Sequence, residues 1–493
     1  MSPPPSPFGS RAFGADRGLV LLIAGLAVLR LTSAAAIPLT EDEAYYRLWA
    51  QHPQLGYYDH PPMIAWWIRA GTSLVGDNAL GVRLLPALAN LLSTLIIFDL
   101  GRGLGDRRTG FKAALLYNCT LTIGAAAALA VPDVPAGLFW TMTLWALAKA
   151  ANGDNSPRWW LAAGAAAGLA CLSKYSALFL APGVVLWLAV TKPGRKQLAH
   201  PWPWICAALA LAVFSLNIGW NAAHHWETFA KQFGRATPGR FAPRYLLELL
   251  AGQFLLLNPA VAILAAIGAA RAWRARSETP LAWLMAASMA PFAAYLILHS
   301  LHDRVQAHWP VPLYSGAAVL AAWASDEVQG WRAGLARWAP IGLALSVLAL
   351  AHAVLPQTDL GPGDPARQLR GWPAFAQAVD KARETTGANW IGALSYGVDA
   401  QLQAADPYGA PILQISERER YADLPPRTAP DFRQPGLIVD LRRRIDLARL
   451  RTCFARVGSV IEIDRGQGGG PNARYGAVAV AGPMVDLLGK GCE

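Results

Sequence analysis

Charged residues are scarce in this chain, which has 493 residues. Asp, Glu, Lys and Arg make up only 15% of the sequence, whereas hydrophobic residues make up 54%. Soluble globular proteins carry about a quarter charged residues, so this composition excludes that class and predicts a polytopic membrane protein. The net charge of +11 does not indicate nucleic-acid binding, because most basic residues outside the C-terminal region lie in short loops between apolar runs.

Cysteine is also scarce, with five residues in the whole chain. Three of them lie inside apolar runs, and no CxxC or Cys/His spacing typical of zinc is present. We therefore expect no cofactor, and no ligand motif supports a divalent cation. Cys453 and Cys492 lie in the C-terminal region and could form one disulfide if that region is extracytoplasmic, but the sequence leaves their pairing open.

Apolar runs of spanning length, roughly 20 residues for ~30 Å of hydrocarbon, follow one another from residue 18 to residue 355. The run 159–191 is interrupted at Ser173-Lys174-Tyr175, so we split it into a hairpin with the lysine at its tip. This gives eleven predicted spans, near 18–38, 79–100, 111–131, 134–150, 159–173, 176–191, 202–221, 244–270, 280–298, 309–324 and 338–355.

The predicted domains are a disordered cytoplasmic N-terminus (1–17), a transmembrane catalytic domain (18–355) and a C-terminal domain (356–493). The N-terminus is proline-rich, and the apolar run after it has no A-x-A cleavage site, so we expect an uncleaved first span. Residues 373–386 are helix-like. Strand-like stretches at 390–397, 410–416, 436–441, 458–464 and 476–482 complete a small α/β domain. The glycine cluster at 466–471 has no helix pattern after it, which favours a hairpin loop.

The loop charges predict an orientation. Basic residues gather in alternate loops, for example Arg102, Arg107 and Arg108, and the positive-inside rule makes that side cytoplasmic. The opposite loops contain Asp42, Asp59, Asp133, Lys174, Glu227 and the stretch HSLHDRVQAHWP. All candidate functional residues, and with eleven spans the C-terminal domain, therefore fall on the extracytoplasmic side.

The stretch 38–69, directly after the first apolar run, contains four carboxylates, two histidines and many aromatic residues. Thr40 and Glu43 have the spacing of a capping box, which predicts a short helix that runs to about Gln51. On that helix Asp42, Tyr46 and Trp49 share one face. A second, amphipathic helix begins near Pro61 or Pro62 and is expected to lie in the membrane interface.

Each acidic residue also has a structural interpretation. Glu43 is best explained as part of the cap, whereas Asp42 adds little to capping and is better explained by function. Asp59 could cap the second helix. Asp133, in Pro132-Asp133-Val134-Pro135, is expected at the membrane surface, where a carboxylate is costly unless it is paired or hydrated. A capping role for Asp133 is an equal alternative.

Three basic residues are candidates for binding an anion. Lys174 on the outer side runs against the orientation rule, so a lipid phosphate is a better explanation than simple snorkelling. Arg304 and His308 are expected one helical turn apart, and the planar arginine fork suits a phosphate. His299, His302, Asp303 and His308 do not complete a metal-binding spacing, which gives the metal interpretation low weight.

Taken together, several motifs resemble a known family. These are Asp42-Glu43, Tyr58-Asp59-His60-Pro61-Pro62, Pro132-Asp133, Ser173-Lys174-Tyr175 and Trp309-Pro310. In combination, over residues 18 to about 325, they resemble bacterial members of glycosyltransferase family 39 and the related lipid A aminoarabinose transferases, in the GT-C superfamily.

The resemblance implies a multi-pass enzyme of the bacterial inner membrane. Such an enzyme transfers a sugar with inversion from a polyprenyl-phosphate donor to lipid A, a core oligosaccharide, another glycan or a protein at the periplasmic face. By resemblance, Asp42 is the general base, Asp133 is the second catalytic aspartate and Lys174 neutralises the donor phosphate. Glu43, Tyr58, Asp59, His60, Arg304 and His308 are the other expected substrate-binding residues.

One departure from the family is visible. The aminoarabinose transferases have a lysine before the proline where this chain has His60. The resemblance therefore does not imply the phosphate contact that this lysine makes, and it does not imply that the sugar is aminoarabinose. Two rival functions have less support. A transporter or flippase would place ionisable residues near the bilayer midplane and often has repeated halves. A ligase of lipid-linked glycans has the same needs at the membrane surface and is harder to exclude.

Overall fold

The computed structural model describes residues 17–126, 129–151, 156–234, 240–326, 331–355, 360–361, 363–405, 409–421, 424–426, 428–466, 474–489 and 491–492. The predicted disordered N-terminus therefore lies, apart from Arg17, outside the described residues. The chain forms two compact units. The helical unit comprises the residues up to Ala35 and Leu55–Leu350, and the C-terminal unit comprises Ala36–Gln54 together with the residues from Ala351 onward.

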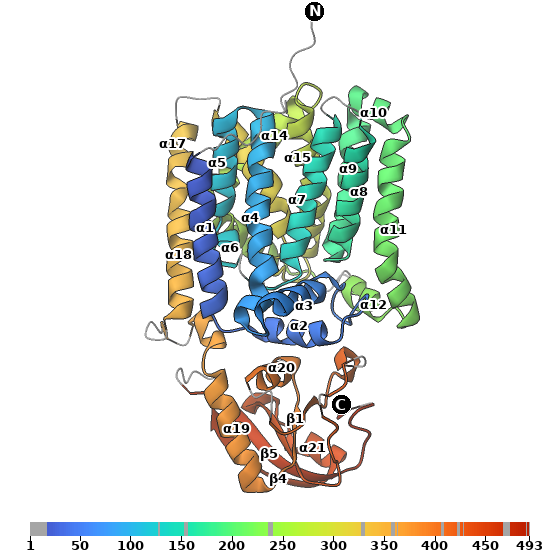
Figure 1. Cartoon of the computed structure of the whole chain (residues 1–493), viewed down its shortest axis with the longest axis vertical. Coiled ribbons are helices and arrows are strands. Elements are labelled where there is room, and N and C mark those ends of the chain that lie inside the picture. The colour runs from blue at the N-terminus through green and yellow to red at the C-terminus, as the bar shows by residue number, and fades with distance from the viewer. Residues whose placement is uncertain are drawn as a thin grey trace, which may run out of the picture. The chain divides into compact units, whose positions relative to one another are not determined.

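The helical unit is built from apolar helices, many of which run side by side (Figure 1). It contains α1 (Arg17–Ala36), α3 (Met63–Val75), α4 (Ala79–Leu104), α5 (Arg107–Asn118), α6 (Leu121–Ala126), α7 (Asp133–Lys149), α8 (Pro157–Cys171), η2 (Tyr175–Phe179), α9 (Leu180–Val190), α10 (Lys192–Leu198), α11 (Trp202–Ala223), α12 (Glu227–Gly234), α13 (Arg244–Leu256), α14 (Pro259–Arg274), α15 (Pro280–His299), η3 (Val311–Leu313), α16 (Tyr314–Asp326), α17 (Trp331–Trp338) and α18 (Pro340–Val354), whose last residues extend into the C-terminal unit.

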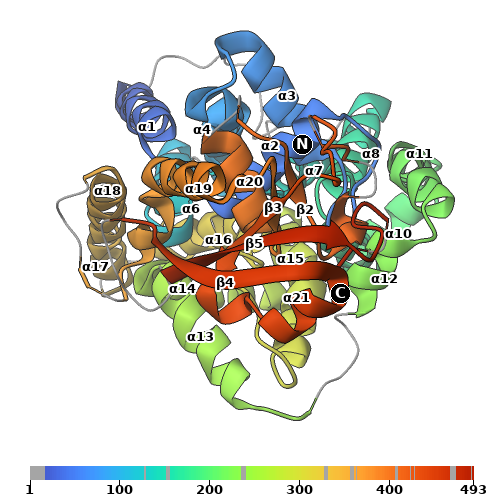
Figure 2. The same cartoon turned by 90° about the horizontal axis from the view of Figure 1, so that it is seen from below.

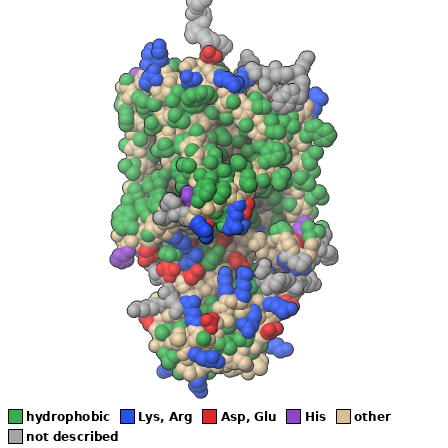
Figure 3. Space-filling view, turned by 180° about the vertical axis from the view of Figure 1, so that it is seen from behind, with side chains coloured by type: hydrophobic (Ala, Val, Ile, Leu, Met, Phe, Trp, Pro, Cys, Tyr) green, Lys and Arg blue, Asp and Glu red, His purple; other side chains and the backbone are tan. Residues whose placement is uncertain are grey.

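The surface of this unit is consistent with a membrane protein. A broad band of hydrophobic side chains covers the face of this unit that Figure 3 shows, and Lys and Arg side chains lie at the upper end of that face. Within the described residues, five helices are long and apolar enough to cross a membrane, or seven if each of two bent helix pairs is one span. The count of eleven spans stays a prediction.

Several predicted runs are not single straight helices. The run 244–270 divides into α13 and α14, which are bent by 105°. The bend has a local cause, because Asn258 adopts a positive φ of 74° and Pro259 then starts a new helix. The run 111–131 likewise contains two helices, since α5 ends at Asn118 and α6 begins at Leu121.

The predicted break in the run 159–191 is present. Helix α8 ends at Cys171, and the 3-10 turn η2 separates it from α9. Helices α8 and α11 pack closely at Gly168, because a Cβ at this position would lie 2.6 Å from the Cβ of Val213 on α11. Small residues allow such close approach of helices in a membrane.

The C-terminal unit is a small α/β structure (Figure 2). It contains α2 (Glu41–Gln51), η4 (Pro365–Leu369), α19 (Trp372–Thr386), β1 (Trp390–Ala393), α20 (Tyr396–Ala405), β2 (Ile412–Gln414), η5 (Arg418–Tyr421), β3 (Gly436–Leu441), η6 (Arg442–Arg444), α21 (Leu447–Cys453), β4 (Phe454–Asp464) and β5 (Arg474–Pro483). The strands follow the order β2-β1-β3-β5-β4, in which β1 pairs in parallel with β2 and β3, and β5 pairs antiparallel with β3 and β4.

The predicted helix is confirmed, and each of the five predicted stretches contains a strand. The stretch 390–397 is a strand only over β1, because α20 begins at Tyr396. Phe375 and Val379 of α19 pack with Leu437, Val439 and Ala477 of the sheet in one buried cluster. The pairing that the sequence left open is present, since Cys453 and Cys492 form a disulfide. Most of the glycine cluster at 466–471 lies outside the described residues.

Candidate functional site

The start of α2 is built as the sequence predicted. Thr40 is the N-cap, and its Oγ1 accepts a hydrogen bond from the Glu43 backbone N–H at 3.2 Å. The Glu43 carboxylate in turn accepts hydrogen bonds from the Thr40 backbone N–H at 2.9 Å and the Thr40 hydroxyl at 3.1 Å. Glu43 is fully buried. Its carboxylate therefore serves the helix cap, the structural role that the sequence favoured.

Asp42 has a different environment from Glu43. It is exposed, and its Oδ1 accepts a hydrogen bond of 2.9 Å from the hydroxyl of Tyr396, the first residue of α20. The neighbouring Glu41 lies in a more buried position, and burial raises the pKa of its carboxyl. Solvent can therefore reach the Asp42 carboxylate, and the neutral hydroxyl of Tyr396 donates a hydrogen bond to it.

Asp133 and Lys174 form a buried ion pair in the helical unit. The Lys174 Nζ donates to Asp133 Oδ1 at 2.6 Å, and the two side chains are 12% and 4% exposed. The N-cap of α7 is Pro132 without a side-chain hydrogen bond, so Asp133 does not cap that helix through its carboxylate. The His308 Nε2 lies 3.7 Å from Asp133 Oδ2, and His60 is close enough to act electrostatically on the same carboxylate.

The Tyr58-Asp59 motif binds helix α12 of the same unit. The Asp59 carboxylate pairs with Lys231, whose Nζ also lies 4.1 Å from the centre of the Tyr58 ring. Gln232 Nε2 donates to the Asp59 backbone carbonyl at 2.5 Å. The second predicted helix, α3, has Pro62 as its N-cap with no side-chain hydrogen bond, so Asp59 does not cap it. The sequence did not predict the contribution of Lys231.

The prediction that Arg304 and His308 lie one helical turn apart is wrong, because the chain between α15 and η3 is not helical. Arg304 is 62% exposed at its side chain and forms a forked contact with Glu248, at 2.7 Å from Nε and 3.2 Å from an Nη atom. His308 instead faces Asp133. No group of three or more potential metal ligands occurs among the described residues.

Two cavities lie beside the turn η2, and Lys174 lines the first of them. The first has a volume of about 130 Å³ and joins polar groups to aromatic rings: it is lined by Lys174, Tyr175, Ser176, Phe179, Gln232, Phe233, Phe292, Tyr295 and Trp309. The second is an apolar groove of about 310 Å³ between α7, α8, α9 and α11. Its lining runs from Cys171 and Ala177 at one end to Leu198 and Pro203 at the other.

The turn η2 borders both cavities. Tyr175, Ser176 and Phe179 line the first cavity, whereas Ala177 and Leu178 line the apolar groove. A cation, a set of aromatic rings and a long apolar groove are thus adjacent along one short segment. This arrangement suits a ligand with an anionic head and a hydrocarbon tail.

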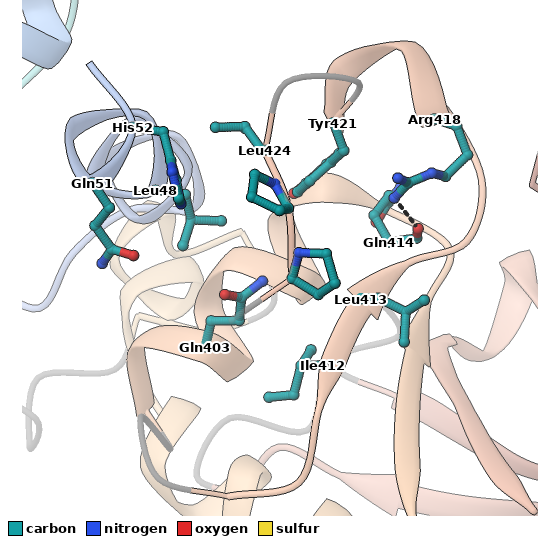
Figure 4. Close-up of a pocket in the computed structure, with 12 residues that line it drawn as sticks. Leu48, Gln51, His52, Gln403, Ile412, Leu413, Gln414, Arg418, Tyr421 and Leu424 are labelled. Atoms are coloured by element: carbon teal, nitrogen blue, oxygen red, sulfur yellow. Dashed lines mark hydrogen bonds between the residues drawn. The ribbon is translucent and has the colours of Figure 1, made fainter. Parts of the chain in front are cut away.

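A third cavity lies within the C-terminal unit. In Figure 4 Leu48 and Gln51 of α2, with His52 directly after that helix, face Gln403 of α20 and Leu424 across it. Its volume is about 20 Å³, close to what one water molecule needs. This cavity is therefore too small for a sugar or a lipid head group.

Comparisons with known proteins agree with the motifs. Residues 59–220 match the family described as dolichyl-phosphate-mannose-protein mannosyltransferase. The chain is 29% identical over 338 residues to the lipid A galacturonosyltransferase RgtD of Rhizobium johnstonii, a match that covers 65% of this chain and 66% of that protein. It is 28% identical over 269 residues to undecaprenyl phosphate-alpha-4-amino-4-deoxy-L-arabinose arabinosyl transferase 1 of Pseudomonas fluorescens, covering 50% and 47% of the two chains.

Solved structures show the same fold. ArnT from Cupriavidus metallidurans bound to undecaprenyl phosphate superposes with a TM-score of 0.66 at 18% identity, and the match covers 95% of this chain and 100% of that chain. The archaeal oligosaccharyltransferase AglB from Archaeoglobus fulgidus superposes with a TM-score of 0.51 at 12% identity, covering 80% and 65% of the two chains. Matches to the curated relatives span between about half and two thirds of their length.

The fold is therefore the ArnT-like GT-C fold, with several apolar helices and a small C-terminal sheet. The similarity in sequence extends over the motifs from Asp59 to Lys174, which fall within the matched family region. The resemblance predicted from the motifs is confirmed, and this chain is a relative of the glycosyltransferases of the GT-C superfamily.

Proposed function

We propose that this protein transfers a sugar from a polyprenyl-phosphate donor to a hydroxyl group of an envelope glycolipid or glycan, at the periplasmic face of the inner membrane. The observation that carries the proposal is the buried Asp133–Lys174 pair on an aromatic cavity, with an apolar groove on the other side of η2. The arabinosyl transferase of Pseudomonas fluorescens is named for an undecaprenyl-phosphate sugar, and the ArnT structure was determined with undecaprenyl phosphate bound, which supports the same class of donor here.

In the proposed reaction, the Asp42 carboxylate takes the proton of the acceptor hydroxyl. The hydroxyl oxygen forms a bond to the anomeric carbon from the face opposite the phosphate, and the bond between that carbon and the phosphate oxygen breaks. The electron pair leaves with the polyprenyl phosphate, so the configuration at the anomeric carbon is inverted. Because a phosphate is a stable leaving group, the site does not need a strong general acid.

Lys174 is the proposed partner of the donor phosphate. Its ammonium group lines the aromatic cavity while it pairs with Asp133, so it is held in one place before the donor arrives. A preorganised cation stabilises the charge that grows on the leaving phosphate. We assign to Asp133 the task of fixing this ammonium group, and to His308 and His60 a supporting electrostatic role near the same carboxylate.

The apolar groove is the proposed place of the first part of the polyprenyl chain. Its lining is almost entirely hydrophobic and includes Leu147, Ala207 and Phe214. Each CH₂ group that leaves water contributes about 0.8 kcal/mol, although lipid already shields such a chain, so the groove provides orientation more than affinity. The names of the two curated relatives specify different sugars. We therefore propose the class of donor, a polyprenyl-phosphate sugar, and no particular sugar.

Binding of undecaprenyl phosphate to the purified full chain tests the donor site. We expect Lys174→Met to weaken binding at least tenfold in native mass spectrometry, and Ala207→Trp to weaken it by filling the groove. Lys192→Met on α10 and Ala208→Trp, which does not line the groove, are the matched controls. Equal binding by the wild type and both site variants would contradict the proposed donor site.

A further inference from the structure

The hydrogen bond between Tyr396 and Asp42 joins residues that lie 354 positions apart in the sequence. Both residues belong to the C-terminal unit, since α2 clusters with that unit. The contact therefore lies within one compact body, and it sets the surroundings of the carboxylate that the proposed function uses as its base.

Helix α2 is firmly attached to this unit by aromatic packing. The Tyr45 ring lies 5.0 Å from the Tyr396 ring and 5.6 Å from the Tyr421 ring, measured between centroids. The Tyr45 hydroxyl donates to the Arg420 backbone carbonyl at 3.2 Å. On the side of Asp42, Gln401 Nε2 donates to the Leu39 backbone carbonyl just before α2, at 2.8 Å. The backbone that carries Asp42 is thus anchored at several points.

Tyr396 is itself held in place. The Arg420 guanidinium lies 4.7 Å from the centre of the Tyr396 ring, and Arg420 pairs with Glu417 at 3.0 Å. Burial and the negative charge of Asp42 raise the pKa of the Tyr396 hydroxyl above its ordinary value. The hydroxyl consequently keeps its proton at neutral pH and donates it in the hydrogen bond to the Asp42 carboxylate.

We propose that Tyr396 is a positioning residue for Asp42, and that its hydroxyl fixes the carboxylate in the orientation from which it accepts the proton of the acceptor. The inference rests on the proposed function, because it gives Tyr396 a role only if Asp42 is the base. The hydrogen bond from Tyr396 restricts the rotation of the Asp42 carboxylate. A positioned base is a recognised requirement for efficient proton transfer.

The hydrogen bond also has an electrostatic effect on Asp42. A donor to an ionised carboxylate favours the ionised form, so removal of the Tyr396 hydroxyl is expected to change the pH dependence of transfer. Charged groups in this neighbourhood include Glu41 on α2, Arg420 on η5, and Arg444, Arg465 and Asp440 around Glu41. All of these stay in place when the hydroxyl of Tyr396 is removed, so a change in the pH profile reports on that hydroxyl.

The test uses the purified full chain and membrane vesicles from a strain that lacks the gene, which contain both donor and unmodified acceptor. Transfer rates between pH 5 and pH 9 are measured by mass spectrometry of the product for wild type, Tyr396→Phe, Tyr475→Phe and Asp42→Asn. Tyr475 is the matched control, because it lies in the same unit and its hydroxyl accepts a hydrogen bond from Arg465.

We expect Tyr396→Phe to lower the rate at neutral pH by about 10- to 100-fold, as for the loss of a hydrogen bond to a charged group. The acidic limb of its pH profile should move to higher pH, because the donor that favours the ionised carboxylate is lost, and its melting temperature should stay near that of the wild type. The inference is overturned if Tyr396→Phe has the transfer rate and the acidic limb of the wild type. It is also overturned if Tyr396→Phe and Tyr475→Phe lose the same fraction of the transfer rate and neither shifts the acidic limb. An active Asp42→Asn would instead overturn the assignment of Asp42 in the proposed function.

Discussion

The ion pair between Asp133 and Lys174 makes a quantitative prediction about stability and binding. Two unit charges 2.6 Å apart attract with about 6 kcal/mol at an effective dielectric constant of about 20. Much of this attraction is offset by the loss of hydration, since both side chains are buried. Removing one partner leaves the other charge buried and unpaired, which costs about 3–5 kcal/mol.

We therefore expect Lys174→Met and Asp133→Asn to lower the free energy of unfolding by about 3 kcal/mol each. The double variant should lie within about 1 kcal/mol of the wild type, because no buried charge is left unpaired. The measurement is equilibrium unfolding of the full chain in detergent micelles, with Arg304→Met as a control that breaks the exposed pair with Glu248 and costs less than about 1 kcal/mol.

The same variants separate structure from function. The double variant should regain stability and still fail to bind undecaprenyl phosphate, because the ammonium group is absent. If the double variant binds as tightly as the wild type, Lys174 serves only as the partner of Asp133. If the effects of the two single variants on stability simply add in the double variant, the pair is not coupled and the electrostatic reasoning fails.

Three further predictions concern the C-terminal unit. Burial raises the pKa of Asp399 to about 7, so the folded state binds more protons than the unfolded state between about pH 4 and pH 7 and its stability falls as the pH rises through that range. Asp399→Asn should remove this dependence, measured as melting temperature against pH; an unchanged profile would contradict the assigned cause. Replacing both Cys453 and Cys492 by Ser should cost about 4 kcal/mol, since the disulfide spans a sequence separation of 39 residues; thermal unfolding with and without reductant checks this, and equal stability would contradict it. Gly436→Val should prevent folding of the sheet, because a Cβ there would lie 2.2 Å from the Trp390 ring. The measurement is limited proteolysis of the full chain, and protease resistance of the C-terminal unit equal to that of the wild type would refute this prediction.

Local patterns in the sequence were sufficient to predict many elements of the fold. The capping box at Thr40 and Glu43 predicted the start of α2, and short apolar stretches in the C-terminal region predicted where the five strands lie. These features depend on residues that are close together in the chain, which a sequence displays directly. The bend at Asn258 was missed, because an apolar run does not reveal a residue with positive φ.

Contacts between distant segments were the part that the sequence could not provide. Asp133 and Lys174 were each selected for their chemistry, but the pattern gave no reason to expect them 2.6 Å apart. Lys231 and Tyr396 were not selected at all. One signal for Tyr396 was present, since it follows a parallel strand, β1, at the carboxyl end where α/β folds often place functional residues. Its partner on α2 could be found only in three dimensions.

The most direct test of the central claim is the mass of the envelope glycolipids in a strain that lacks the gene, complemented with wild type or with Asp42→Asn. We predict that the deletion removes a sugar-sized mass from one glycolipid while the polyprenyl-phosphate sugar accumulates, and that only the wild type restores it. Full restoration by Asp42→Asn would contradict the role of Asp42 as the base, and unchanged glycolipids in the deletion strain would contradict the proposed transfer itself.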